Sequence, residues 1–399
     1  MKILFDLYTP QFFVGGAGEY IRTVFYELIK TCNESQKDIQ VVALMDLSVK
    51  KYPYPDLSPI SLRNLNINIV DIHNNTLKDI IKTNSIDKIF IGAAQYWGMR
   101  LDVENISCPV VCVVHDLMDE EFATSHIKDY LLLGKWKSFI HFQIGEIWRK
   151  YSFHHNLGCK RMTPIRTLME NNPHCTLVTV SEYSKISIIY HYNLPKERIL
   201  VRYSPERRML INDNIENKIL SHIISSNKKY YLLLNANRFT KNPDKVISTF
   251  EKYINNIEKD AYIVTVGYPK SRYPQHIILP YLSESDLGQA ISHCYALIFP
   301  SVFEGFGYPP IEAMKYGKPV LASNVTSIPE VLGDAPIYFS PLYESDIYKA
   351  LTILNEENYK YYSQKSSRRY DVISQRQKSD LIKLINLILS TPLCATHKK

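Results

Sequence analysis

Short apolar runs alternate with segments of helical period along this chain, and no other feature restricts its fold as strongly. The runs are rich in Ile, Val and Leu and fall into two sets separated by a polar stretch, so we predict an α/β protein with parallel sheets covered by helices. The predicted central strands are residues 3–5, 41–44, 88–91, 110–114 and 177–180 in the first set, and 231–234, 263–266, 296–299 and 319–322 in the second.

The length of 399 residues is too great for one ordinary core and suits two domains. The polar stretch at 212–227 lies between the two sets of strands, so we place the linker near 205–227. The last amphipathic segment, 381–389, is apolar on most faces and is expected to pack against the protein.

The composition is that of a soluble globular enzyme, and the net charge of +7 fits anionic substrates or an anionic membrane surface without requiring either. No apolar run reaches the length of a membrane span, and Asp6 interrupts the N-terminal run too early for a signal peptide. We therefore expect a cytoplasmic protein. Its seven cysteines show no Cys-x-x-Cys spacing and are expected to be reduced thiols.

A glycine turn between two glutamates follows the apolar run at 295–299. Glu304 and Glu312 flank Gly305-Phe306-Gly307, whose glycines let the backbone approach a ligand closely. Pro310 is expected to begin a helix with Glu312 in its first turn, near backbone N–H groups that can hold an anion. An isolated glutamate here would be a surface charge, but the pair in this setting favours a sugar-nucleotide site.

This passage, with Ala322-Ser323-Asn324 and Ile328-Pro329-Glu330-Val331 after it, closely resembles retaining glycosyltransferases of family 4 (glycosyl transferases group 1). The resemblance implies the GT-B fold, in which two Rossmann-like parallel-sheet domains face each other across a cleft. It places an acceptor-binding domain at 1–210 and a nucleotide-sugar-binding domain at 211–372. A C-terminal helix within 373–399 would pack back toward the first domain.

A second glycine turn, Gly15-Gly16-Ala17-Gly18, opens a segment of helical period after the first strand. Such a loop directs backbone N–H groups at a phosphate or lets a substrate lie against bare backbone. A dinucleotide-binding motif would need a third glycine where Ile21 stands, so we set a dehydrogenase aside. The turn resembles the N-terminal glycine turn of the family, although Glu19 stands where an arginine is common. A tight turn without a ligand is the alternative.

His115 and Asp116 follow the strand at 110–114, at the end where open parallel sheets bind ligands. By the resemblance, His115 contacts the donor sugar and Asp116 lies at the cleft. A single histidine at a strand end is often structural, and that interpretation stays open. Ser181 is expected to cap the helix that begins beside it.

Arg238 and Lys241 follow the strand at 231–234, with a spacing that suits a diphosphate. They resemble the Arg/Lys pair that holds the donor pyrophosphate in the family, and a solvated surface pair is the alternative. The resemblance also implies net retention, with Glu312 bonding the ribose, Glu304 holding a sugar hydroxyl, and attack from the leaving-group face. The candidate catalytic residues are Glu304, His115 and Asp116, and the candidate donor-binding residues are Gly16, Gly18, Arg238, Lys241, Gly305, Phe306, Gly307 and Glu312.

No Asp-x-Asp sequence occurs, so we expect no metal and no other cofactor, with protein cations in place of the metal. The expected partners are a nucleotide-sugar donor and a saccharide or lipid-linked saccharide acceptor. The basic and aromatic segment at 130–166 suits peripheral contact with the cytoplasmic face of a membrane, or an ordinary amphipathic helix pair. No nucleic-acid-binding motif accompanies the charge.

The expected function is transfer of a hexosyl group, with mannosyl slightly favoured by 304–341, in surface polysaccharide or glycoconjugate assembly. The first alternative is a nucleotide-sugar epimerase on the same fold, for which Asp116, Asp119 and Glu120 are the available acid/base cluster. The second is a catalytically silent sugar-nucleotide binding module, which a fold alone never excludes.

Overall fold

The computed structural model of the chain describes residues 1–35, 38–73, 76–97, 106, 108–118, 120–121, 165–208 and 214–390. These residues form two compact units. Unit 1 contains the described residues up to 121 together with 165–207 and 376–390, and unit 2 contains those of 208–375.

Unit 1 is built on a parallel sheet whose described strands have the order β3-β2-β1-β4-β5-β6-β7. These strands are β1 Lys2–Asp6, β2 Gln40–Met45, β3 Asn68–Asp71, β4 Lys88–Ile91, β5 Val110–Val114, β6 Cys175–Thr179 and β7 Ile199–Val201. The helices are α1 Thr9–Phe12, α2 Gly16–Glu34, α3 Pro59–Asn64, α4 Leu77–Asn84 and α8 Glu182–Tyr192, with short 3-10 turns at η1 Pro55–Leu57, η2 Ala94–Tyr96 and η3 Lys196–Arg198.

Unit 2 has a second parallel sheet, with the order β10-β9-β8-β11-β12-β13. Its strands are β8 Tyr230–Leu233, β9 Tyr262–Val266, β10 His276–Leu279, β11 Ala296–Phe299, β12 Val320–Ser323 and β13 Ile337–Phe339. Its helices are α9 Lys218–Ser225, α10 Pro243–Asn256, α11 Glu284–His293, α12 Tyr308–Lys315, α13 Ile328–Leu332, α14 Glu344–Ile353 and the first part of α15 Glu356–Leu389, with a 3-10 turn at η4 Phe239–Lys241.

The predicted α/β architecture with two Rossmann-like parallel sheets is confirmed, and each of the nine predicted central strands is present within two residues of its expected bounds. The linker prediction was too long, because α9 occupies residues within the predicted range of 205–227. Leu220 and Ile223 on α9 are buried, and Asn217 caps its first turn through a side-chain bond to the Leu220 N–H at 3.0 Å. Because α9 is short and has polar residues on either side, its amphipathic pattern was not recognised in the sequence.

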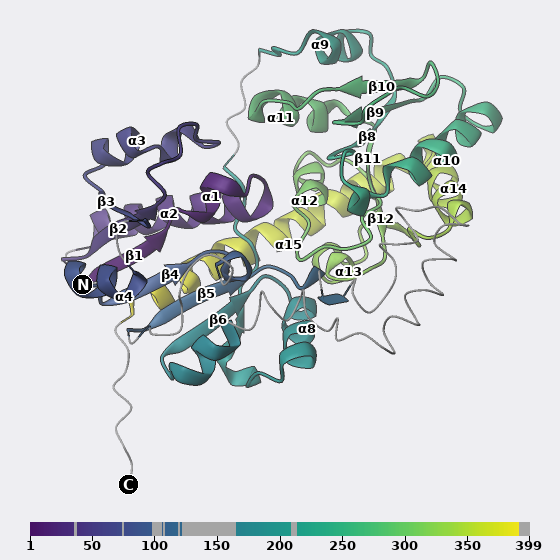
Figure 1. Ribbon diagram of the computed structural model, residues 1–399. Helices are drawn as coiled ribbons and strands as arrows, with labels where there is room; N and C mark the ends of the chain where they lie inside the picture. The colour runs from purple at the N-terminus through teal and green to yellow at the C-terminus, as the bar shows by residue number, and fades with distance from the viewer. Residues whose placement is uncertain are drawn as a thin grey trace, which may run out of the picture. The chain divides into compact units, whose positions relative to one another are not determined.

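Each unit has its own apolar core. In unit 2, α10 and α14 lie together against one face of the sheet, as Figure 1 shows, and bury Phe250 and Leu351 against Tyr231 of β8. In unit 1 the core collects the apolar side chains of β1, β2, β4, β5 and β6. Because both faces of the central strands are covered, their sequences are almost continuously apolar.

The last turns of α15 belong to unit 1. Leu384, Ile385 and Ile388 are buried there, and Lys88 donates from Nζ to the backbone oxygens of Leu387 and Ser390 at 2.7 and 2.6 Å. A buried lysine thus satisfies carbonyl groups at the C-terminal end of the helix, where a cation is favoured.

Among the described residues, no helix combines the length and the apolar character that crossing a bilayer requires. The basic and aromatic segment of 130–166 lies outside the described residues, apart from Ile165 and Arg166 in a short helical stretch.

Candidate functional site

The carboxyl ends of β8 and β11 in unit 2 bring Lys241 and Glu304 together. Lys241 is 8% exposed, pairs from Nζ with Glu304 Oε1, and lies 4.6 Å from the centre of the Phe299 ring. The Ser301 hydroxyl donates to the same carboxylate oxygen at 2.6 Å. The structure therefore joins two of the predicted site residues, 63 positions apart in the sequence, in one partly buried ion pair.

The backbone of Glu304 is held from the loop after β12. Its N–H donates to Thr326 Oγ1 at 3.1 Å, and its carbonyl accepts from Ser327 Oγ at 2.9 Å. Thr326 has a positive φ of 53°, which is uncommon for a β-branched residue. Sequence reasoning did not single out Thr326 or Ser327, because only the fold brings the two loops together.

Gly305, Phe306 and Gly307 form a buried turn that leads into α12. Gly307 has a φ of +91°, and a Cβ there would lie 3.4 Å from Phe299 Cε1. A side chain at this position would be strained mainly by the positive φ, and in addition by the short distance to Phe299.

The predicted start of α12 at Pro310 was wrong, because the helix begins at Tyr308 with Gly307 as its N-cap. Pro309 and Pro310 occupy the first turn, where a missing N–H costs no intrahelical bond. Glu312 therefore lies beyond the first turn of α12, and not within it as the sequence predicted. It is buried, with 7% exposure, on the helix that follows the glycine turn.

Arg238 and Lys241 share the turn η4 but differ in environment. The Lys241 N–H donates to the Arg238 carbonyl at 3.0 Å, which closes the turn, while the Arg238 side chain is exposed. Asn242 follows with a φ of +46° and donates from Nδ2 to the Pro341 carbonyl at 2.7 Å. The exposed guanidinium is available to a ligand, whereas Lys241 is held in place by its contacts.

The glycine turn in unit 1 begins α2, as predicted from the sequence. Gly15 is the N-cap, with a φ of +115°, and its N–H donates to the Tyr54 hydroxyl at 3.3 Å. A Cβ on Gly18 would lie 2.6 Å from both the Phe13 carbonyl oxygen and the Tyr54 hydroxyl, so packing alone accounts for this glycine. Gly16 is exposed.

The structure explains why Ile21 can stand where a dinucleotide-binding motif has glycine. A Cβ on Gly92, which follows β4, would lie 2.2 Å from Ile21 Cγ1. Gly92 thus supplies the space that lets α2 approach the sheet, and the helix keeps a large apolar side chain at the contact. The small residue at the contact between α2 and the sheet is therefore Gly92, after β4, and not a glycine on the helix.

His115 is buried at the end of β5, and its environment keeps the ring neutral. Burial lowers its pKa from 6.5 to about 4, although a hydrogen bond with Gly92 acts in the opposite direction. Nε2 lies 2.9 Å from the Gly92 carbonyl oxygen, which can only accept, so Nε2 carries the proton. Nδ1 is then the acceptor atom of the ring. The Tyr20 ring packs edge-on against it at 4.8 Å.

Asp6 supports this arrangement through the other backbone group of Gly92, its N–H. Its Oδ2 accepts from the Gly92 N–H at 3.1 Å and from Thr9 Oγ1 at 2.7 Å, and its Oδ1 accepts from the Thr9 N–H at 2.9 Å. Burial is the main reason that its pKa is raised to about 6. Sequence reasoning used Asp6 only as an interruption of an apolar run, although a carboxylate ending a buried strand was the available indication of a role.

Asp6→Asn is expected to lower the free energy of unfolding by about 1–3 kcal/mol at pH 7, because an amide NH₂ would face either the Gly92 N–H or the Thr9 N–H. The pKa of Asp6 is higher in the folded protein than in the unfolded chain. Protonated Asp6 therefore adds to the free energy of unfolding below about pH 4, and this addition is lost as the pH rises to about 6. Denaturant unfolding across this range should show that wild-type stability falls relative to the variant. The exposed Asp38→Asn is the control, and parallel pH profiles for wild type and Asp6→Asn would contradict the assignment.

The carboxylates considered for an epimerase are engaged in local contacts where the structure describes them. Asp116 Oδ1 accepts from the Met118 N–H at 3.2 Å, and Glu120 Oε1 accepts from the Tyr192 hydroxyl at 2.5 Å. Asp119 lies outside the described residues. Ser181 caps α8 as predicted, by accepting from the Ser184 N–H at 3.1 Å.

Comparison with known proteins gives matches of three kinds: relatives by sequence, solved structures and a family model. "Serotype-specific mannosyltransferase WbdA" of Escherichia coli is 26% identical over 277 residues, which are 66% of this chain and 31% of that protein. "O-antigen chain mannosyltransferase RfbU" of Salmonella typhimurium is 30% identical over 179 residues, covering 41% of this chain and 46% of that protein. The matches thus cover less than half the length of either relative.

Two solved structures share the fold over nearly the whole chain. Sucrose-phosphate synthase from Thermosynechococcus elongatus aligns with a TM-score of 0.66 at 12% identity, covering 97% of this chain and 98% of that one. Anabaena Alr3699/HepE in complex with UDP aligns with a TM-score of 0.65 at 15% identity, covering 96% and 98%. Residues 214–339, which hold Arg238, Lys241, Glu304 and Glu312, match the family model for glycosyl transferases group 1. The second unit therefore resembles glycosyl transferases group 1 over residues 214–339, and the two Rossmann-like units have an architecture similar to that of GT-B glycosyltransferases.

Proposed function

We propose that the protein is a retaining glycosyltransferase that moves a hexosyl group from a nucleoside-diphosphate sugar to a saccharide or lipid-linked saccharide. The observation that carries this proposal is the partly buried Lys241–Glu304 pair at the carboxyl ends of β8 and β11, within the segment that matches glycosyl transferases group 1. Open parallel sheets bind ligands at this edge.

Lys241 supplies a fixed positive charge to the leaving diphosphate. Negative charge develops on that group as the glycosidic bond breaks, and a cation already held in place stabilises the transition state more than the ground state. Arg238, exposed on the same turn, adds donors that match phosphate oxygens. These two cations act where a metal ion would otherwise serve, so we propose a reaction that requires no metal.

The two glutamates act in binding. Glu304 is oriented by Lys241 and Ser301 and holds a hydroxyl of the donor sugar, while Glu312 accepts hydrogen bonds from the ribose. Neither carboxylate is assigned as a nucleophile, so the acceptor attacks from the face that the leaving group occupies and the anomeric configuration is retained. His115, neutral and with Nδ1 as its acceptor atom, is suited to a sugar hydroxyl.

Mannose is the donor sugar that we favour, because WbdA and RfbU are both named mannosyltransferases. The name of RfbU refers to the O-antigen chain, which supports a role in surface polysaccharide assembly. The nucleotide is proposed as GDP by the same reasoning, although Alr3699/HepE was solved with UDP. We propose that the enzyme works in the cytoplasm, at the inner face of the membrane if its acceptor is lipid-linked.

The test is release of nucleoside diphosphate by the purified chain from GDP-mannose, GDP-fucose, UDP-glucose, UDP-galactose and UDP-N-acetylglucosamine, in the presence of EDTA. We expect turnover with one donor, faster when a mannosylated acceptor is present. An α-linked product from an α-linked donor, identified by NMR, would support retention. Loss of turnover in EDTA that Mg²⁺ or Mn²⁺ restores would contradict the proposed metal independence.

Two results would favour the other functions. Donor conversion to a stereoisomer without consumption of acceptor indicates an epimerase. Saturable nucleotide binding without turnover of any donor indicates a binding module. Absence of both turnover and a thermal shift with every nucleotide would contradict the donor site itself.

A further inference from the structure

A basic groove lies in unit 1, and none of its lining residues belongs to the candidate site described above. The edge strand β7, the first turns of α8 and the last part of α15 enclose about 520 Å³. This volume is in the range of small-molecule sites. The lining residues are Glu182, Lys185, Ile199, Leu200, Val201, Arg202, Arg376, Ser379, Asp380 and Lys383.

The α15 side of the groove has more cations than its carboxylate can neutralise. Asp380 is buried, and its Oδ2 accepts from the Tyr203 N–H at 3.0 Å and lies 3.5 Å from Arg376 Nε. Its Oδ1 lies 3.6 Å from Lys383 Nζ. Arg376 also lies over the Tyr203 ring at 3.6 Å. A single carboxylate is thus shared by two cations, and Arg376 is held rigidly by its stacking contact.

On the opposite side, Lys185 and Arg202 have no carboxylate partner among the described residues. Arg202 donates from Nη1 to the Val201 carbonyl at 2.7 Å, while its Nε is buried and makes no hydrogen bond within that part of the chain. A buried guanidinium N–H without an acceptor is costly, and a guanidinium that turns toward an anion in the groove would gain an acceptor. The planar fork of a guanidinium matches phosphate oxygens.

We propose that this groove is a second anion site that binds one phosphate group of a ligand, with Arg202 and Lys185 as its anchors. The four cations and two carboxylates of the lining give a net charge of +2, which balances a phosphate monoester dianion. Glu182 is exposed at the groove and disfavours ligands of higher charge, which separates this site from one for a nucleoside diphosphate.

A phosphate in the groove joins parts of unit 1 that are distant in sequence. Arg202 follows β7, Lys185 lies on α8, and Arg376 and Lys383 lie on α15. The bound group would therefore hold the last turns of α15 against β7 and α8, and its binding should protect these segments together from local opening.

The experiment measures hydrogen exchange of the full-length protein with two probes that carry the same phosphate chemistry. One is soluble glycerol 3-phosphate, and the other is phosphatidylcholine vesicles containing phosphatidic acid, compared with phosphatidylcholine alone. We expect slower exchange in peptides from 182–192 and 376–389. In Lys185→Gln/Arg202→Gln the apparent Kd should rise about tenfold or more, as for the loss of one charged hydrogen bond.

The control is Arg63→Gln/Lys78→Gln, which removes one arginine and one lysine from the exposed faces of α3 and α4 in the same unit. It should keep the affinity of the wild type.

Protection by glycerol 3-phosphate identifies a soluble phosphorylated ligand, and protection by the acidic vesicles alone identifies a lipid headgroup. If the double variant unfolds, the single Lys185→Gln, at a half-buried position, replaces it. No protection with either probe, or an equal response in the groove variant and the control, would overturn the proposal.

Discussion

Lys241→Met is expected to lower the rate of nucleoside-diphosphate release by about two to three orders of magnitude, the range found when one preorganised donor to a developing anion is removed. The physical reason is that Lys241 is buried and fixed by Glu304 and the Phe299 ring, so no solvent molecule replaces its charge at the leaving group. The measurement is steady-state turnover with the donor identified in the panel.

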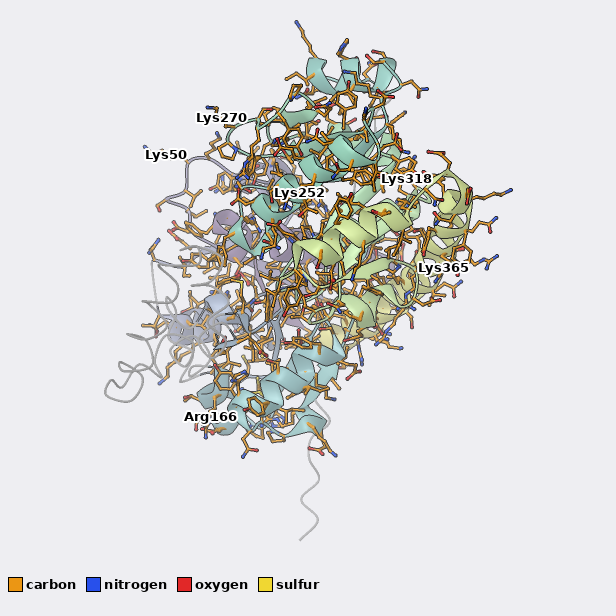
Figure 2. The ribbon with its side chains drawn as sticks, turned by 90° about the vertical axis from the view of Figure 1, so that its right-hand side faces the viewer. Lys50, Arg166, Lys252, Lys270, Lys318 and Lys365 are labelled. Atoms are coloured by element: carbon orange, nitrogen blue, oxygen red, sulfur yellow. The ribbon has the colours of Figure 1, made fainter. Side chains whose placement is uncertain are left out.

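The same substitution leaves the partly buried Glu304 carboxylate without its cation, which is expected to cost stability as well as turnover. The double variant Lys241→Met/Glu304→Gln removes that charge and should recover most of the lost thermal stability while turnover stays low. Lys252→Met is the charge control, because Lys252 lies on the surface of α10 and pairs with Glu344 at 2.7 Å (Figure 2). Turnover restored in the double variant would mean that Lys241 acts only in folding.

The strands that sequence reasoning identified are those with a neighbour on both sides, and the ones it omitted are the four sheet edges. Among the described residues, the two sheets end at β3, β7, β10 and β13. β3 has the sequence Asn-Ile-Val-Asp with no fully buried residue, and β7 and β13 are three residues long. Edge strands are short and partly solvated, so their apolar runs are too brief to separate them from apolar stretches in loops and helices.

The residues of the candidate site could be predicted from the sequence, but most of their contacts could not. The turn of Gly305 to Gly307 and the cations of η4 follow apolar runs in the sequence. Their positions at the ends of strands could therefore be predicted. The Lys241–Glu304 pair and the link from Asp6 through Gly92 to His115 join distant segments, and only the strand order places these side chains together. Gly92 binds Asp6 and His115 through its backbone N–H and carbonyl groups. A glycine in the sequence gives no indication of such contacts.

Glu312→Gln is expected to raise the KM for the nucleotide sugar by about tenfold to a hundredfold with a smaller change in kcat, because hydrogen bonds to a charged carboxylate contribute about 1.5–3 kcal/mol. A carboxylate can accept from both ribose hydroxyls, whereas an amide offers one acceptor and places two N–H donors where the second hydroxyl would donate. Glu312 is buried on α12, and glutamine matches its volume, so the fold should persist. The exposed Glu251→Gln on α10 is the control.

A ribose contact also predicts that a donor with 2′-deoxyribose binds the wild type more weakly than the ribose donor does, whereas Glu312→Gln should bind the two donors about equally. Equal losses in both proteins would place Glu312 away from the ribose, and a fall in kcat alone would assign it to the sugar being transferred.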